Sequence, residues 1–360
     1  MIWYAKVQVM YEKTFDNQTL ESIRKWVAGA ESVVLVAHLN ADGDACGSLL
    51  GCTLLLDRFA AGARSIVPIL PTGCPENFQW LPGAERIVAG DKSEAAKLIG
   101  EADLIVTLDL NNPDRIEPLT EAFKAAKGHK LLVDHHHNPV TEHYDTIVSD
   151  PTISSTCELV HWLARALWGT DCLTKEAATC LYTGLRTDTG GFAFSCHQPS
   201  CFEAAAQLVA LDINPAEIHN RINNNFSIAR MEFYGFALSQ RLHIFPQQRV
   251  AYFDLCEEVL KSHHVTTDDL EGLVNYTLMM RDIETGALLR GEDPVSGLTN
   301  TVSGLTNTVK VSLRTKGDKP MHLIAQRYGG GGHPKAAGFT LHCPFDEAVE
   351  IVKKELGIEN

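Results

Sequence analysis

The chain has 360 residues, a formal net charge of −14 and 45% hydrophobic residues. This length is enough for two domains with cores of their own, and the composition is that of an ordinary globular protein. The acidic balance argues against a protein that tracks long DNA or RNA, because such proteins carry a basic stripe. No apolar run reaches the ~20 residues of a membrane span. We therefore expect no membrane partner, and a homodimer is left open.

The ten cysteines form no CxxC pair and have no regular spacing. Free thiols in a reducing compartment fit this pattern better than a disulfide framework does. The N-terminus lacks the layout of a signal peptide. These features together predict a cytoplasmic protein.

Apolar, strand-like runs alternate with helical patterns from Ser32 to about Ala193, as in VVLVAH, SIVPIL, LIVTLDL and KLLVDH. Such alternation predicts an α/β fold with a doubly wound parallel sheet, which we place at residues 1–205. A helical linker is expected over 206–235. A smaller α/β domain across a cleft is expected over 236–360, with a hairpin in LHIFPQQRVAYFDL and a strand in NTVKVSLRTKG. The repeated heptapeptide SGLTNTV, at 296–302 and 303–309, predicts a lengthened surface loop.

The stretch VVLVAHLNADGDACGS, residues 33–48, places three polar side chains between a predicted strand and a predicted helix: His38, Asp42 and Asp44. In open α/β sheets ligands bind at the carboxyl ends of the strands. Carboxylates held close together repel one another unless a cation neutralises them. A metal site is one interpretation, and a polar turn with Asp44 as the helix N-cap is the other.

Three later stretches favour the metal interpretation, because each places carboxylate or imidazole near the end of an apolar run. Asp109 ends LIVTLDL, Asp134 to His137 end HKLLVDHHH, and Asp188 precedes a glycine pair in LRTDTGGF. A mixed Asp/His set suits Mn²⁺ or Mg²⁺ better than a structural Zn²⁺. It could hold two ions about 4 Å apart that activate a bridging water for attack on phosphorus.

The order HLNADGDA, LDLN, DHHHNP and LRTDTGGF resembles the four motifs of the DHH phosphoesterase family. The later run YGGGGHPKAAGF, residues 328–339, is similar to the signature of the associated DHHA1 domain. The resemblance spans the chain from about Ser32 to about Leu341. It implies a metal-dependent phosphodiesterase or phosphatase.

The resemblance implies two Mn²⁺ ions, with Mg²⁺ as the alternative, and a ligand set for each. One ion would be held by His38, Asp42 and Asp109, and the other by Asp44, Asp109, His135 and Asp188, with Asp109 bridging. His136 would lie beside the phosphate as a second catalytic residue with Asp109, stabilising charge or delivering a proton to the leaving oxygen. Asp134 would orient an imidazole, and no role is expected for His137.

Glycine-rich backbone can approach an anion closely, and the run Gly329 to Gly332 precedes His333. By resemblance, Arg314, Gly330, Gly331, Gly332 and His333 would bind a substrate phosphate or terminal nucleotide. The alternative is a helix C-cap followed by a flexible loop. Asn275 is a weaker candidate for the same surface. Arg186 departs from the family pattern, since a smaller or apolar residue is expected there. The sequence therefore does not determine the net charge around Asp188.

Proteins of this family and length resemble the nanoRNase/pAp-phosphatase group. The resemblance implies hydrolysis of short oligoribonucleotides to mononucleotides and of adenosine 3′,5′-bisphosphate (pAp) to AMP. Cyclic di-AMP, or its linear product pApA, is the alternative substrate. RecJ-like exonucleases usually add a further nucleic-acid-binding domain, and family II pyrophosphatases lack the GGGGH ending. A nucleotide-binding protein without turnover is the alternative of another class. The physiological metal and the polarity of attack stay open.

Overall fold

The computed structural model describes residues 15–358, apart from 91, 267, 271 and 293–307. The chain forms two compact units, Met1–Asn224 and Asn225–Asn360. The boundary between them falls inside the segment 206–235, for which we predicted a helical linker. The SGLTNTV repeat lies outside the described residues, except for its last two positions.

The first unit is built on a six-stranded sheet in the order β3-β2-β1-β4-β5-β6. Every neighbouring pair is parallel, which confirms the predicted sheet. The strands are short apolar runs rich in β-branched residues, as expected where both faces are covered. Their bounds are β1 Ser32–Ala37, β2 Ser65–Leu70, β3 Val88–Ala89, β4 Leu104–Leu108, β5 His129–Asp134 and β6 Thr146–Ser149.

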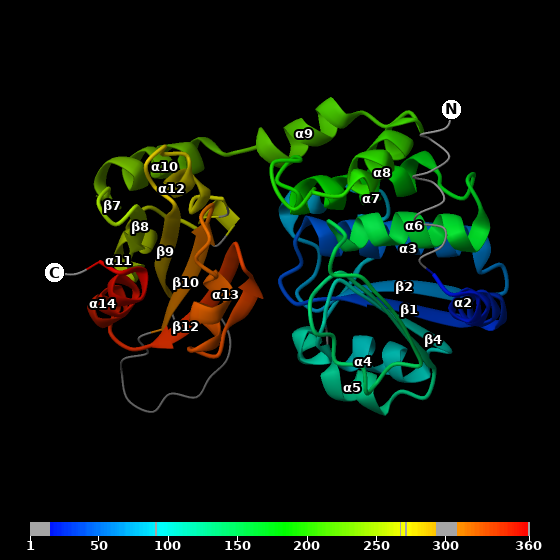
Figure 1. Ribbon diagram of the computed structural model, residues 1–360. Helices are drawn as coiled ribbons and strands as arrows, with labels where there is room; N and C mark the ends of the chain where they lie inside the picture. The colour runs from blue at the N-terminus through cyan, green and yellow to red at the C-terminus, as the bar shows by residue number, and fades with distance from the viewer. Residues whose placement is uncertain (1–14, 91, 267, 271, 293–307, 359–360) are drawn as a thin grey trace. The chain divides into compact units, whose positions relative to one another are not determined.

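Helices cover both faces of this sheet, as the doubly wound prediction requires (Figure 1). Successive residues of β1 point to opposite faces, so that Val33 and Leu35 belong to one core and Val34 and Val36 to the other. The first core is closed by α2 Asn17–Gly29, α3 Gly43–Phe59, α6 Thr156–Trp168, α7 Lys175–Asp188, α8 Pro199–Val209 and α9 Pro215–Asn223, and the second by α4 Lys92–Glu101 and α5 Thr120–Ala125. Short 3-10 turns lie at η1 Glu76–Phe78, η2 Ala84–Arg86 and η3 Pro113–Ile116.

The strand order reverses between β1 and β4, and this switch point is where such sheets bind ligands. The helix α3, which follows β1, packs closely on α7, because Gly47 of α3 and Gly184 of α7 lie at the contact. A Cβ on Gly47 would lie 2.5 Å from the Cys180 carbonyl oxygen, and one on Gly184 would lie 2.9 Å from Asp44 Oδ1. The two glycines therefore let the start of α3 and the end of α7 meet at the same edge of the sheet.

The second unit has a six-stranded sheet in the order β11-β12-β10-β9-β8-β7. The predicted hairpin is confirmed as β7 and β8, which pair antiparallel, while β8 and β9 pair parallel. The bounds are β7 Leu242–Phe245, β8 Val250–Leu255, β9 Thr285–Glu292, β10 Thr308–Thr315, β11 Gly331–His333 and β12 Ala336–His342. In β10 the predicted alternation holds, since Val309, Val311 and Leu313 are each 1% exposed and the residues between them are less buried.

One face of the second sheet packs on α13 Met321–Gln326 and α14 Phe345–Leu356, and the other on α10 Ile228–Gln240 and on the segment that includes η4 Asp268–Leu270 and α12 Asn275–Leu278. A further helix, α11 Glu257–Ser262, follows β8. All ten cysteines are free thiols, which confirms the predicted absence of a disulfide framework. None of the described helices has the length and apolar character needed to span a membrane.

Candidate metal centre

The first part of the site lies on the loop between β1 and α3. His38 directly follows β1, and Asp42 precedes α3. Oδ1 of Asp42 accepts hydrogen bonds from the backbone N–H groups of Asp44 and Ala45, both at 3.0 Å, so Asp42 is the N-cap. The alternative in which Asp44 caps the helix is therefore wrong. Asp44 lies in the first turn instead, where the helix dipole favours a negative charge.

Asp109 follows β4 and lies between two imidazoles. Its φ of +59° is in the left-handed region, which Asp tolerates better than most residues. Oδ2 of Asp109 lies 3.5 Å from His38 Nε2, and Oδ1 lies 3.6 Å from His135 Nε2. One carboxylate thus presents a different oxygen to each imidazole, which is the arrangement expected of a ligand shared by two ions.

The second part of the site comes from β5 and α7. His135 follows β5 and is 6% exposed, and its Nε2 lies 3.5 Å from Asp188 Oδ2 and 3.9 Å from Asp44 Oδ2. Asp188 is the last residue of α7, where the helix dipole disfavours a carboxylate. The cluster therefore holds a negative charge at an unfavourable position, which a bound cation would relieve.

Both buried histidines contact the backbone, and in His38 the contact assigns the ring nitrogens. Nδ1 of His38 lies 2.8 Å from the Leu39 carbonyl oxygen, which can only accept, so Nδ1 is the donor. The neutral ring then points the lone pair of Nε2 at the carboxylates. His135 is likewise hydrogen-bonded with the backbone of Ile153. Backbone contacts of this kind hold a metal-binding imidazole in one tautomer.

The side chain of His136 is 20% exposed, its Nδ1 lies 3.6 Å from Asp109 Oδ1, and its ring meets the His135 ring edge to face, with the centroids 4.8 Å apart. Its Nδ1 lies 2.7 Å from Asp134 Oδ1, and its Nε2 lies 3.4 Å from Arg115 Nη1. Asp134 is fully buried, and among the described residues its Oδ2 has no hydrogen-bond partner. The pair resembles an imidazole oriented by a buried carboxylate, the role that we predicted for Asp134.

The start of α6 supplies contacts that the sequence did not reveal. The backbone N–H groups of Thr156 and Cys157 donate to the two oxygens of Asp44, at 2.7 and 2.9 Å. The hydroxyl of Thr156 donates to Asp109 Oδ1 at 3.0 Å. Ser155 is the N-cap of this helix, so the serine and threonine run before it was the available signal. The helix N-terminus therefore positions two of the predicted ligands.

The carboxylates of the cluster titrate very differently. Burial, and then the charges of Asp109 and Asp188, raise the pKa of Asp44 well above its ordinary value. Burial also raises the pKa of Asp188, together with the charges of Asp42 and Asp109. Burial acts in the same direction on Asp109, but the hydrogen bond and charge of His38 outweigh it and lower the pKa of Asp109.

The donor set fits a hard divalent cation. Three groups have ligand atoms within 4.8 Å of one another and share Asp109: His38 with Asp42, Asp44 with His135, and Asp134 with His136. Carboxylate oxygens with a few imidazole nitrogens suit Mn²⁺ or Mg²⁺. Burial and then mutual repulsion raise the pKa values of Asp44 and Asp188, and a cation would stabilise their charged forms against both.

The side chain of Arg186, which could have added a positive charge near Asp188, contacts α9 instead. Its Nη1 donates to Asn223 Oδ1 at 2.9 Å, and its Nη2 contacts Nδ1 of His219. Both partners belong to α9, so the guanidinium fastens that helix to the end of α7. Among the described contacts, Arg186 makes no ion pair with the cluster carboxylates.

The predicted substrate-binding residues lie in the second unit. Gly331, Gly332 and His333 form β11 rather than a loop, and the register pairs His333 with Ala336 and Ala336 with Arg314. Residues directly opposite on neighbouring strands share a face of the sheet. His333 and Arg314 therefore share one row and one face, two strands apart. Gly330 precedes this strand, and Asn275 begins α12.

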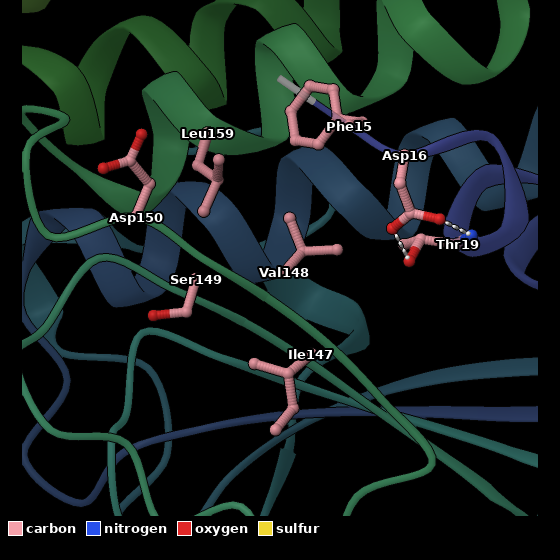
Figure 2. Close-up of a pocket in the computed structure, with 8 residues that line it drawn as sticks. All are labelled: Phe15, Asp16, Thr19, Ile147, Val148, Ser149, Asp150 and Leu159. Atoms are coloured by element: carbon pink, nitrogen blue, oxygen red, sulfur yellow. Dashed lines mark hydrogen bonds between the residues drawn. The ribbon is translucent and has the colours of Figure 1, made fainter. Parts of the chain in front are cut away.

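A separate pocket lies between the start of α2, β6 and α6 (Figure 2). Its polar groups serve the local backbone: Asp16 accepts from Thr19 N at 2.9 Å, and Asp150 accepts from Thr152 N at 2.9 Å. None of the predicted site residues lines this pocket.

Two family models match the chain, the DHH family, N-terminal domain, over residues 32–185 and the DHHA1 domain over residues 248–357. The chain belongs to the DHH family of phosphoesterases. The predicted enzyme class, a hydrolase that acts on phosphoester bonds, is confirmed.

A solved structure from Bacteroides fragilis, an exopolyphosphatase-related protein, is 31% identical, with a TM-score of 0.87 over 96% of this chain and 97% of that chain. The bifunctional oligoribonuclease and PAP phosphatase NrnA of Thermus thermophilus is 27% identical over 350 residues, which cover 90% of each chain. More distant is the cyclic-di-AMP phosphodiesterase GdpP of Geobacillus thermodenitrificans, 22% identical over 89% of this chain and 46% of that protein.

Proposed function

We propose that this protein hydrolyses short oligoribonucleotides to mononucleotides and converts pAp to AMP. The observation that carries the proposal is the Asp109-centred cluster at the switch point of the sheet, in a chain that aligns with NrnA over 90% of both lengths. The net charge of −14 supports a short substrate, because long nucleic acids bind to extended basic surfaces.

The proposed ligands are divided between two sites that share Asp109. The first site consists of His38, Asp42 and Asp109, and the second of Asp44, Asp109, His135 and Asp188. Divalent ions at these sites, Mn²⁺ or Mg²⁺, would supply Lewis acidity and an activated water. The protein contributes the positions of the ligands, which the N-termini of α3 and α6 hold by backbone N–H groups.

His136 is the proposed proton donor to the leaving oxygen. Its Nδ1 is held by Asp134 at 2.7 Å, which fixes the ring and leaves Nε2 as the atom that would face the leaving oxygen. His136 therefore acts on the substrate, while Asp134 acts through His136.

Arg314, His333 and the backbone of Gly330 to Gly332 are proposed to bind a substrate phosphate or terminal nucleotide. The shared row and face of His333 and Arg314 support this, since two strands bring their backbones about 10 Å apart. Long side chains at that spacing can reach one phosphate group together.

Cyclic di-AMP, or linear pApA, is the alternative substrate, favoured by the alignment with GdpP. That alignment covers only 46% of GdpP and has the lower identity, so we rank the short oligoribonucleotide first. A nucleotide-binding protein without turnover is the remaining alternative, and intact sets of proposed ligands argue against it.

Product analysis by chromatography tests the proposal. The purified protein with Mn²⁺ is given a 5′-labelled diribonucleotide, pAp and cyclic di-AMP in separate reactions, with Asp109→Ala as the inactive control. Rapid loss of the first two substrates, abolished in the variant, is the expected result. Preference for cyclic di-AMP would favour the alternative substrate. Absence of turnover with metal bound would leave the binding-protein interpretation.

A further inference from the structure

Arg115 brings a positive charge to the edge of the acidic cluster. It lies in η3, six residues after Asp109, and its Nη1 is 3.4 Å from His136 Nε2. This contact places the guanidinium beside an imidazole whose Nδ1 lies 3.6 Å from Asp109 Oδ1.

In the part of the chain that the structure describes, the guanidinium of Arg115 makes no ion pair. Within the described residues its hydrogen-bond partner is the imidazole of His136, and no carboxylate pairs with it. A guanidinium has five N–H donors in a planar fork, and one contact with an imidazole uses only one of them. The remaining donors can bind another acceptor beside His136.

The backbone around Arg115 is held firmly. Its carbonyl oxygen accepts from Leu39 N at 2.8 Å, which ties η3 to the loop that carries His38. Asn112 caps the 3-10 turn by accepting from Asp114 N at 2.9 Å, and Thr120 donates its hydroxyl to Pro113 O at 3.1 Å. The side chain thus starts from a fixed point and needs no rearrangement of the loop to meet a ligand.

Orienting His136 does not require Arg115. The shorter contact to that ring is the one from Asp134, at 2.7 Å against 3.4 Å for Arg115, and it lies on the opposite nitrogen. At 3.4 Å the contact from Arg115 is long, and Arg115 is partly exposed to solvent, so this is a weak structural contact. Its position beside the proposed proton donor needs another explanation.

We propose that Arg115 binds a nonbridging oxygen of the substrate phosphate next to His136. This inference rests on the proposed function. A planar guanidinium matches phosphate geometry and can make two parallel hydrogen bonds to it. It also gives an anionic substrate a fixed positive charge in the first unit, where Asp42, Asp44, Asp109 and Asp188 otherwise repel it.

Steady-state kinetics of Arg115→Gln, Arg115→Lys and Arg115→Ala on pAp and the diribonucleotide test this inference. Removing a preorganised donor to a phosphoryl oxygen lowers kcat/KM by about 10²–10³-fold, and we expect that loss in R115Q. R115K keeps the charge but loses the fork, so an intermediate loss is expected. Millimolar guanidinium should restore part of the activity of R115A, while calorimetric Mn²⁺ affinity stays that of the wild type.

Arg64→Gln is the matched control for loss of one positive charge. Arg64 precedes β2 at the opposite edge of the sheet, and its side chain is 81% exposed, with Glu31 at 3.3 Å. We expect wild-type kinetics from R64Q. Circular dichroism shows whether R115Q is folded. If it is not, the kinetics of R115K are used for the comparison instead, because lysine retains the positive charge at the same backbone position.

The outcomes separate this inference from the proposed function. A wild-type protein without turnover overturns both. An active wild type with R115Q or R115K indistinguishable from R64Q overturns the role of Arg115 alone. Weakened Mn²⁺ binding in R115Q, or no response of R115A to guanidinium, also overturns it, because Arg115 would then be a structural residue.

Discussion

Replacing Thr156 by valine tests whether the start of α6 positions the bridging carboxylate. Thr156 and Asp109 are both buried, and the hydroxyl donates to Asp109 Oδ1 at 3.0 Å. The lowered pKa of Asp109 means that this acceptor is charged at neutral pH. Valine has nearly the same shape but no donor, so the change removes the hydrogen bond and leaves the packing almost intact.

The expected loss of stability follows from the hydrogen bond between Thr156 and Asp109. A hydrogen bond to a charged group contributes about 1.5–3 kcal/mol, and that is the expected loss in the free energy of unfolding of the metal-free protein. The same hydroxyl fixes which oxygen of Asp109 faces His135. Losing a group that orients a ligand costs about 10–100-fold in metal affinity, and we expect Mn²⁺ to bind Thr156→Val weaker by that factor.

Urea unfolding in chelator and calorimetric titration with Mn²⁺ measure the two effects. Thr156→Ser is the matched control, because it keeps the hydroxyl and loses only a methyl group. The reasoning is refuted if the valine variant is as stable as the serine variant and binds Mn²⁺ equally tightly. That result would mean that the backbone N–H groups alone hold the cluster.

Three further results are expected. Metal binding should release protons at pH 6 to 7. Burial alone lowers the pKa values of His38 and His135, but the surrounding carboxylates raise them above the ordinary value. Calorimetric titration with Mn²⁺ in buffers of different ionisation enthalpy measures the proton release, and a binding enthalpy that does not depend on the buffer would contradict it. Gly184→Ala should cost about 1–3 kcal/mol in urea unfolding, because its Cβ would clash with Cys157 Sγ and lie 2.9 Å from Asp44 Oδ1. Gly235→Ala, in open space on α10, should be neutral or stabilising, and equal effects would refute the packing argument. Burial lowers the pKa of His161 to about 3, so below pH 6.5 the unfolded chain binds the proton first and stability falls with acid. Between pH 8 and pH 5 the wild type should lose about 2 kcal/mol more than His161→Gln in urea unfolding, and parallel losses would show that His161 does not titrate in this way.

The clustering of these Asp and His side chains could be predicted because they follow the ends of neighbouring strands. Parallel strands have their carboxyl ends at one edge, so His38, Asp109 and His135 had to meet once β1, β4 and β5 were identified as neighbours. Hydrophobic runs specified those strands directly. In the order β3-β2-β1-β4-β5-β6, the loop after β1 and the loop after β4 lie on either side of the switch point.

The contacts of Thr156 and Arg115 could not be predicted in the same way. Thr156 reaches Asp44 across 112 positions of sequence, through a backbone N–H that carries no residue-specific signal. Arg115 lies in a short 3-10 turn, and hydrophobic periodicity does not specify where such a turn aims a side chain. Both contacts depend on tertiary packing, which determines where a helix starts relative to a neighbouring loop.

The glycine-rich run shows how one composition supports two structures. Gly329 and Gly332 have φ values of +73° and +133°, so part of the run has the backbone freedom that we predicted. Gly331, Gly332 and His333 nevertheless pair with β12, because a glycine strand can approach another backbone closely. Composition alone does not separate a loop from a strand of this kind, since neither is specified by side chains.

The two helix N-termini explain how an acidic cluster is stable in the folded chain. Carboxylates that are buried together repel, and backbone N–H groups are the donors that can hold them without adding a competing cation. Asp42 accepts from the start of α3 and Asp44 from the start of α6, whereas Asp188 lies at a helix C-terminus and has no such support. Among the described carboxylates of the cluster, the charge that the helices leave uncompensated is therefore that of Asp188, and a bound cation would stabilise the fold most there.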